Sequence, residues 1–230
     1  MQEDELLREQ VEYYRSRASE YDEWFFRQGR YDRGPAHRQE WLCEVAVVEA
    51  ALAQALTSGN VLELACGTGL WTRRLAESQR HVMAIDASPE AIAINRERVK
   101  SDRVTYQVAD LFSWVPPVGA FDAVVFGFWL SHVPPTKFGS FWAAVKSALR
   151  PGGAVFFVDS LFEQASTAAN HDPIDTSGVV RRKLNDGREF SVVKVFYEPE
   201  ILERRLIDLG WRGYVRSSGR FFLYGSMSAG

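Results

Sequence analysis

The chain has 230 residues, of which 46% are hydrophobic and 25% are charged, a composition that fits one globular domain over residues 1–230 and excludes disordered, collagen-like and coiled-coil proteins. Its 27 lysines and arginines are balanced by 30 acidic residues, so no overall basic field is present to attract nucleic acid or anionic lipid. The two cysteines and four histidines are scattered, without the spacing of a metal site or a disulfide framework, and no metal is expected.

The first 35 residues predict an N-terminal helical lid. They mix charged residues with aromatic ones, and the aromatic side of such helices needs a surface to cover. The first ten residues are polar and acidic, and no apolar run in the chain approaches the roughly 20 residues of a membrane span. A cytoplasmic protein without a membrane partner is therefore expected. The aromatic residues of this arm are Tyr13, Tyr14, Tyr21, Trp24, Phe25 and Phe26.

Strands and helices are predicted to alternate from residue 35 to residue 160. Apolar residues three or four positions apart, from Trp41 to Leu56, predict a helix that ends near residues 58 and 59. Short apolar runs followed by helical patterns predict buried strands, and Ser88 and Pro89 can cap the helix that follows them. This alternation predicts a doubly wound α/β fold with a largely parallel sheet. The expected strands are 61–65, 81–85, 104–108, 121–126 and 154–158, and the further helices are 70–77, 90–100 and 136–149.

The pattern changes after residue 160. Residues 161–178 show no clear period and predict a loop or short cap helix beside the carboxyl ends of the strands. Asn185-Asp186-Gly187 lies between two β-prone runs and predicts a hairpin, so residues 161–190 are expected to form an insertion on the acceptor side. The basic run 181–183 is expected on a solvated face of that hairpin. A helix over 199–209 and a strand over 220–224 complete the prediction.

A glycine-containing turn follows the first predicted strand. Gly67 and Gly69 stand where the backbone turns tightly and a ligand can approach closely, which suggests a nucleotide-like cofactor. The dinucleotide fingerprint has a third glycine three residues later, but Thr72 stands there, which disfavours NAD and FAD. Glu63 would repel a phosphate and attract a cation with an ammonium and a sulfonium group. Asp86 follows at about the 20-residue spacing at which an acid binds both ribose hydroxyls.

The motifs ELACGTG, AIDAS and VAD, at residues 63–69, 84–88 and 108–110, resemble those of the class I S-adenosylmethionine-dependent methyltransferases. The resemblance extends from residue 40 to the end of the chain. The segments YYRSRASEYDEWF, WLSHVPP, LRPGG and FFLYG also resemble a bacterial subgroup of small-molecule methyltransferases. The resemblance implies a Rossmann-like, seven-stranded, mostly parallel sheet with a final antiparallel strand. It also implies S-adenosylmethionine as cofactor and S-adenosylhomocysteine as product.

The resemblance further implies which residues hold the cofactor. Gly67 and Gly69 would flank the methionyl part, and Asp86 would hold the ribose. Asp110, with the backbone of Leu111, would contact the adenine edge. Glu63, before the turn, would organise the loop or the ammonium group of the cofactor. Arg17 of the arm is suited to a bidentate pair with the cofactor carboxylate. The expected cofactor-binding residues are Tyr14, Arg17, Glu63, Ala65, Gly67, Gly69, Asp86, Ala87, Asp110, Leu111 and Phe128.

Methyl transfer from a sulfonium needs the acceptor, the methyl group and the sulfur held in line in a water-poor pocket, and it requires no metal. An oxygen or protonated nitrogen acceptor must lose a proton, and His132, after the fourth strand, is the candidate base. The alternative is a structural role, in which the ring caps a helix or binds a backbone carbonyl. Aromatic rings can surround a sulfonium or a cationic acceptor. The expected acceptor-binding residues are Tyr21, Trp24, Tyr31, Trp129 and His132.

The favoured function is methyl transfer to an oxygen or nitrogen of a small organic acceptor. Methylation of RNA or protein is the enzymatic alternative, and it predicts a basic strip or an Asn-Pro-Pro-Tyr motif after the fourth strand. The chain has Gly-Phe-Trp-Leu at residues 127–130 instead, which disfavours nucleic acid as a partner. A protein that binds the cofactor without turnover is the alternative from another class. The sequence carries no indication of oligomeric state.

Overall fold

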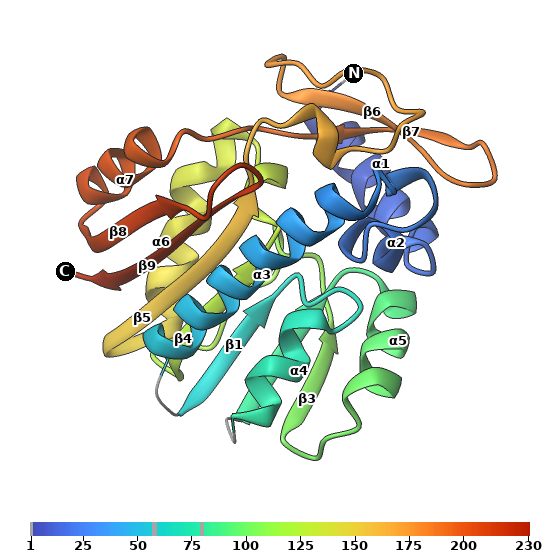
Figure 1. The fold of residues 1–230 in the computed structure, drawn as a ribbon. Coiled ribbons are helices and arrows are strands. Elements are labelled where there is room, and N and C mark those ends of the chain that lie inside the picture. The colour runs from blue at the N-terminus through green and yellow to red at the C-terminus, as the bar shows by residue number, and fades with distance from the viewer. Residues whose placement is uncertain (1, 57–58, 79–80) are drawn as a thin grey trace.

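A seven-stranded sheet forms the centre of the computed structural model, which describes residues 2–56, 59–78 and 81–230 (Figure 1). The strand order is β3-β2-β1-β4-β5-β9-β8. Neighbouring strands from β3 to β5 are parallel, and β9 is antiparallel to both β5 and β8. These strands are β1 Asn60–Leu64, β2 His81–Asp86, β3 Val104–Val108, β4 Phe121–Gly127, β5 Leu149–Ser160, β8 Trp211–Ser217 and β9 Phe222–Ala229.

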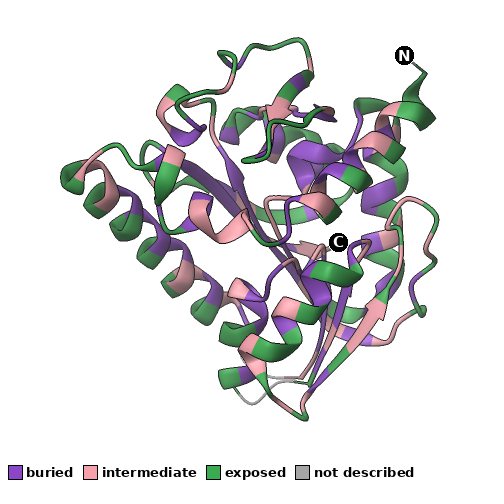
Figure 2. Cartoon of the chain, turned by 90° about the vertical axis from the view of Figure 1, so that its right-hand side faces the viewer, coloured by how far each residue is buried: buried purple, intermediate pink, exposed green. Residues whose placement is uncertain are grey.

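The predicted sheet is confirmed, including its antiparallel strand near the end of the chain. That strand is β9, and it inserts between β5 and β8. β8 was not among the strands expected from the sequence pattern, because its exposed residues interrupt the apolar ones. The inner strands are largely apolar, since both of their faces are covered, although Glu63 interrupts β1 and Asp122 interrupts β4. Figure 2 shows the middle of the sheet as buried and the outward turns of the helices as exposed.

Helices cover both faces of the sheet. Trp41 of α3 and Leu75 of α4 belong to the apolar cluster on one face, together with Ile92 of α5. Trp142 of α6 and Leu202 of α7 belong to the cluster on the other face. The main helices are α1 Glu3–Ser16, α2 Tyr21–Phe25, α3 Pro35–Ala55, α4 Leu70–Glu77, α5 Pro89–Val99, α6 Phe138–Ala148 and α7 Pro199–Asp208. Short 3-10 helices are η1 Gly29–Tyr31, η2 Leu130–His132, η3 Pro135–Lys137 and η4 Gln164–Ser166.

The helix boundaries follow local signals. The Ser88 hydroxyl accepts a hydrogen bond from the Ala91 amide at 3.0 Å, and Pro89 occupies the first turn of α5, so the predicted cap is confirmed. The helix α3 ends at Ala55, while the predicted end near residue 58 falls outside the described residues. In the described part of the chain, no helix combines the length and the apolar character that a membrane crossing requires.

The hairpin of β6 Val179–Lys183 and β7 Glu189–Val193 forms a separate two-stranded sheet. It lies with α1 and α2 over the carboxyl ends of the parallel strands (Figure 1). Two side chains of α1 attach the hairpin. The Glu9 carboxylate accepts a hydrogen bond from the Ser191 amide at 2.6 Å, and the side-chain oxygen of Gln10 accepts one from the Val193 amide at 3.0 Å. The predicted hairpin is confirmed, and the N-terminal arm and the insertion together cover one end of the sheet.

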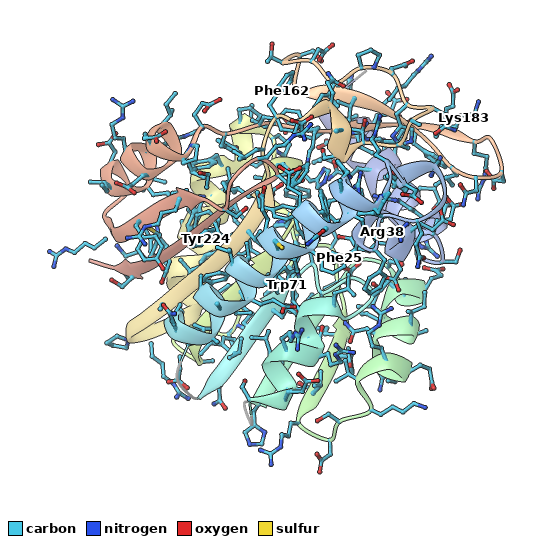
Figure 3. All side chains as sticks on the ribbon, viewed as in Figure 1. Phe25, Arg38, Trp71, Phe162, Lys183 and Tyr224 are labelled. Atoms are coloured by element: carbon cyan, nitrogen blue, oxygen red, sulfur yellow. The ribbon has the colours of Figure 1, made fainter. Side chains whose placement is uncertain are left out.

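The arm is also anchored to the sheet side of the molecule. Phe25 of α2 and Trp71 of α4 lie close together below α3 (Figure 3), with ring centroids 6.5 Å apart. On the other side, the Trp24 indole donates to the Ser166 carbonyl at 3.0 Å. The Arg27 guanidinium donates to the Ala165 carbonyl at 2.7 Å. The arm therefore holds residues 165 and 166, which belong to the loop after β5.

Candidate cofactor and acceptor sites

The turn between β1 and α4 has the backbone conformation that its glycines allow. Gly67 and Gly69 have φ values of 51° and 91°, in the region that favours glycine. A Cβ on Gly69 would lie 2.5 Å from the Asn95 side-chain oxygen, so only glycine fits there. The Asn95 amide donates to the Gly67 carbonyl at 3.2 Å and to the Thr72 hydroxyl at 2.8 Å. Thr72 thus stabilises the loop at the position where a dinucleotide fingerprint has its third glycine.

Asp86 at the end of β2 holds this loop in place. Its carboxylate accepts a hydrogen bond from the Gly67 amide at 2.9 Å and from the Ser88 amide at 2.8 Å. Desolvation by burial raises the pKa of Asp86 above its ordinary value, against the lowering effect of these amides. The carboxylate therefore connects the ends of β1 and β2, the first two strands of the predicted site.

A cavity of about 740 Å³ lies over the ends of β1, β2 and β4 and beneath α1. Among the described residues that line it, Asp86 and Asp110 are the charged ones, and neither lysine nor arginine is present. Such a donor and charge set fits a cation with ribose hydroxyls and disfavours a phosphate. S-adenosylmethionine fits this cavity. The expected cofactor residues that line it are Tyr14, Ala65, Gly67, Asp86, Ala87, Asp110, Leu111 and Phe128.

The other expected cofactor residues lie elsewhere. Arg17 lines a neighbouring cavity, and Gly69 caps α4 without lining either cavity. Glu63 of β1 is 1% exposed, and one of its carboxyl oxygens has no described hydrogen-bond partner. Burial raises the pKa of Glu63 to about 8, against a hydrogen bond with Thr72. The Glu63 side chain is therefore a neutral acid at neutral pH.

Replacing Glu63 by glutamine should remove a pH-dependent loss of stability. The pKa of about 8 in the fold exceeds the ordinary 4.5, so the stabilisation by the protonated group is complete below pH 4.5 and falls as the pH rises through 8. The variant should match the wild type near pH 5 and exceed its free energy of unfolding by roughly 2–4 kcal/mol near pH 9. Denaturant titrations over this range measure the difference. Glu97→Gln, at an exposed position, is the control, and equal pH slopes for wild type and Glu63→Gln would contradict the assignment.

A second cavity, of about 570 Å³, lies between the arm, β5 and the hairpin. It shares Tyr14, Tyr21, Phe128 and His132 with the cofactor cavity, so these four side chains form a common wall. Of the expected acceptor residues, Tyr21, Trp24, Tyr31 and His132 line the second cavity, whereas Trp129 lines only the first. The structure thus places a second cavity, which could hold an acceptor, next to the cavity that could hold the cofactor. The remaining lining residues are Tyr13, Arg17, Ser160, Ser166, Thr167, His171, Arg182, Lys194 and Phe196.

Three cations line this second cavity. Arg17 is 8% exposed, and its guanidinium donates to the Tyr31 hydroxyl at 3.3 Å, while its Nε has no described partner. Arg182 Nη1 lies 3.5 Å from the His171 ring. Neither arginine has a carboxylate within ion-pair distance among the described residues. Buried cations without a counter-ion are costly, so this arrangement favours an anionic ligand.

Lys194 has a carboxylate partner. Its Nζ lies 2.8 Å from the Ser131 hydroxyl and 3.5 Å from the Asp159 carboxylate. Burial lowers the pKa of Lys194, and the negative charge of Asp159 opposes that effect. The other oxygen of Asp159 accepts from the Ser131 amide at 2.8 Å. Asp159 therefore positions both the lysine and the short helix η2 that carries His132.

His132 is buried on the common wall. Its Nδ1 lies 2.6 Å from the Val193 carbonyl, and its Nε2 lies 2.6 Å from the Tyr14 hydroxyl. Because a carbonyl only accepts, Nδ1 carries the proton and Nε2 accepts from Tyr14. Burial and then the charge of Lys194 lower the pKa of His132 well below 6.5. The ring therefore has the backbone contact of the structural alternative and also faces both cavities.

The solvated hairpin face predicted for residues 181–183 holds for Arg181, whose side chain is 68% exposed, but it is wrong for Arg182. Strand β6 alternates, and Val180 and Leu184 are buried on either side of Arg182, so its side chain points inward. This alternation was visible in the sequence and could have identified Arg182. Lys194 and Asp159 carried no comparable signal, because their roles depend on strands far apart in the chain.

Two solved structures match nearly the whole chain. A complex of DhpI with SAH is 38% identical, has a TM-score of 0.79 and covers 100% of this chain and 99% of the DhpI chain. A complex of DhpI with SAM and HEP is also 38% identical, has a TM-score of 0.79 and covers 99% and 100% of the two chains. The similarity includes both the sheet and the segments that cover it.

Further similarity is concentrated in the first part of the sheet. A family model described as a methyltransferase domain matches residues 61–153. The ubiquinone biosynthesis O-methyltransferase of Xanthomonas campestris pv. campestris (strain B100) is 34% identical over 128 residues, which is 54% of this chain and 52% of the relative. The magnesium-protoporphyrin O-methyltransferase of Rhodobacter capsulatus is 37% identical over 83 residues, 35% of this chain and 36% of the relative. The chain thus spans about half or less of the length of these curated relatives.

Proposed function

Because the chain belongs to the class I S-adenosylmethionine-dependent methyltransferases, we propose that it transfers a methyl group from S-adenosylmethionine to an oxygen of a small acceptor that carries an oxyanion. The observation that carries this proposal is the cationic cavity that shares a wall with the cofactor cavity. The curated relatives are O-methyltransferases, which supports oxygen over nitrogen. DhpI forms a complex with SAM and HEP, which supports a second ligand beside the cofactor.

The charge in the acceptor cavity supports an acidic acceptor. Arg17, Arg182 and Lys194 contribute three positive charges, and Asp159 offsets one of them. Lowered pKa values keep His132 and His171 neutral. An excess of positive charge at a partly buried site is stabilised by an anion, and guanidinium groups bind oxyanions through paired hydrogen bonds.

The residues of the two cavities have different roles in the proposed methyl transfer. S-adenosylmethionine, when bound, supplies an electrophilic methyl group. Asp86 and Asp110 attract the cofactor and bind its hydroxyl and amine groups, and the cationic residues hold the acceptor anion against the common wall. The aromatic rings of that wall exclude water from the space between the two ligands. An ionised oxygen is already a nucleophile, so the chain needs to orient it rather than remove its proton.

His132 has a positioning role in this proposal, because its Nε2 is engaged by the Tyr14 hydroxyl. Its pKa lies well below 6.5, so the ring stays neutral between about pH 6 and pH 8. For a fully ionised acceptor, kcat should stay level over this range. In His132→Gln it should fall roughly tenfold to a hundredfold, through misplacement of Tyr14, with the same pH profile. His81→Gln, on the exposed start of β2, is the control. If kcat of the wild type instead falls towards acidic pH, and this fall disappears in His132→Gln, His132 would be identified as the base.

The direct test combines binding with an acceptor panel. Calorimetry should show that S-adenosylhomocysteine and S-adenosylmethionine bind with micromolar-scale affinity, on the order of −8 kcal/mol. Small phosphoryl, phosphonyl and carboxyl acids are then compared with their neutral esters and amides, and the S-adenosylhomocysteine formed is measured. Turnover confined to the acids supports the proposal. Turnover of the neutral compounds alone would contradict the oxyanion, and cofactor binding without turnover would favour a non-catalytic binding protein.

A further inference from the structure

We propose that Asp22 is a positioning residue that couples the two sites, so that a bound cofactor increases the affinity of the acceptor cavity for an anion. This inference rests on the proposed function. Asp22 lies on α2, next to Tyr21 and two residues before Trp24, which both line the acceptor cavity. The Asp22 carboxylate also contacts the turn between β1 and α4, which lines the cofactor cavity and which we call the Thr68 loop. Among the described residues, no other part of α2 contributes a charged contact to that loop.

The contact with the Thr68 loop is a hydrogen bond with Thr68 itself. The Thr68 hydroxyl donates to Asp22 Oδ1 at 2.8 Å. Thr68 is buried, lies between the two glycines of the turn and lines the cofactor cavity. A ligand in that cavity therefore contacts the residue that α2 holds.

Arg98 of α5 strengthens the connection. Its Nη1 donates to the Thr68 carbonyl at 2.7 Å and lies 3.0 Å from the Thr68 hydroxyl oxygen, and its Nη2 forms an ion pair with Asp22. One guanidinium thus holds the loop and the helix together. Since Asp22 and Arg98 are both partly buried, this pair is less screened by solvent than a surface pair.

The helix α2 depends on such contacts for its position. It has five residues, and a helix of that length is not stable by itself in water. Its Trp24 indole donates to the Ser166 carbonyl, and Ser166 also lines the acceptor cavity. A shift of the Thr68 loop is therefore transmitted through Asp22 and Trp24 to the wall that surrounds the acceptor.

The consequence is reciprocal binding. A cofactor that fixes the Thr68 loop stabilises the position of α2 and completes the acceptor cavity before the anion arrives. Linkage then requires that the anion increase cofactor affinity by the same factor. The affinity of the wild-type protein for each ligand should rise about tenfold when the other is present, within the range of measured couplings.

The experiment measures this factor with inorganic phosphate as the anion and S-adenosylhomocysteine as the cofactor probe. Calorimetry gives the affinity of each ligand alone and with the other at saturation. Asp22→Ala should bind each ligand alone but show a coupling factor near one. Thr68→Val, which removes the hydroxyl, should lose most of the coupling, and Thr68→Ser should retain it. Asp32→Ala is the matched control, because Asp32 belongs to the same arm and also pairs with an arginine, Arg38.

The outcomes separate the inference from the proposed function. If the wild type binds S-adenosylhomocysteine but not phosphate, or binds neither, the oxyanion site is wrong and the coupling with it. If both ligands bind without coupling, or Asp22→Ala and Thr68→Val keep the wild-type factor, the proposed function stands and the role of Asp22 is wrong. Thermal unfolding checks that Asp22→Ala is folded. If Asp22→Ala is not folded, the coupling factor of Thr68→Val tests the role of Asp22.

Discussion

Replacing Arg182 by methionine should raise the KM for an oxyanion acceptor about a hundredfold, because truncating one partner of a buried, hydrogen-bonded charge pair costs 2–5 kcal/mol. Affinity for S-adenosylhomocysteine should be unchanged, since Arg182 lines only the acceptor cavity. The melting temperature of the variant should not fall, because Arg182 has no carboxylate partner in the described structure. Steady-state kinetics, calorimetry and thermal unfolding measure these three quantities.

The neighbouring residue supplies the control for this prediction. Arg181 has the same chemistry one position earlier, but it is exposed and pairs with Glu189. Arg181→Met should therefore leave KM, cofactor affinity and stability near their wild-type values. An equal rise of KM in both variants would mean that long-range charge, rather than a contact inside the cavity, attracts the acceptor. An unchanged KM in Arg182→Met would remove the residue from the site.

Replacing Asp86 by asparagine should weaken S-adenosylhomocysteine binding about a hundredfold, or 2.7 kcal/mol. The carboxylate accepts two backbone hydrogen bonds, from Gly67 and Ser88, and asparagine turns one acceptor into a donor that faces an amide. The loop that lines the cofactor cavity then loses one of its supports, in addition to the contact that we propose Asp86 makes with the ribose of the cofactor. Calorimetry measures the affinity, and the phosphate affinity of the cofactor-free protein should change little.

Asp122 provides a matched comparison at the opposite end of the sheet. Its carboxylate accepts from the Asn60 amide at 2.7 Å and pairs with Arg150, so Asp122→Asn also disturbs a strand end. That variant should lose some stability and keep its cofactor affinity. If Asp86→Asn binds S-adenosylhomocysteine within about threefold of the wild type, the cavity that Asp86 lines is not the cofactor site.

The framework of the proposed cofactor site, meaning its strands, its turn and its helix cap, could be predicted because its signals are local. The turn after β1, the cap formed by Ser88 and the acid at the end of β2 each lie within a few residues of the element they belong to. Parallel strands bring their carboxyl ends to the same edge of the sheet. Asp86 and Asp110 therefore line the same cavity because of the strand arrangement alone, without a specific contact between them. The position of Arg17 could not be predicted in this way, because it depends on how the arm lies over the sheet.

The acceptor half was decided by tertiary structure. Its cavity combines the arm, the end of β4, the loop after β5 and the hairpin, and these segments are far apart in the chain. Composition predicted the aromatic arm but not that Arg17, Arg182 and Lys194 face one space. Strand alternation, turn glycines and helix caps are short-range effects that a single sequence shows directly. The charge of a cavity is instead a sum over segments whose relative positions are determined only when α1 packs against β7 and α2 is held by Thr68 and Ser166.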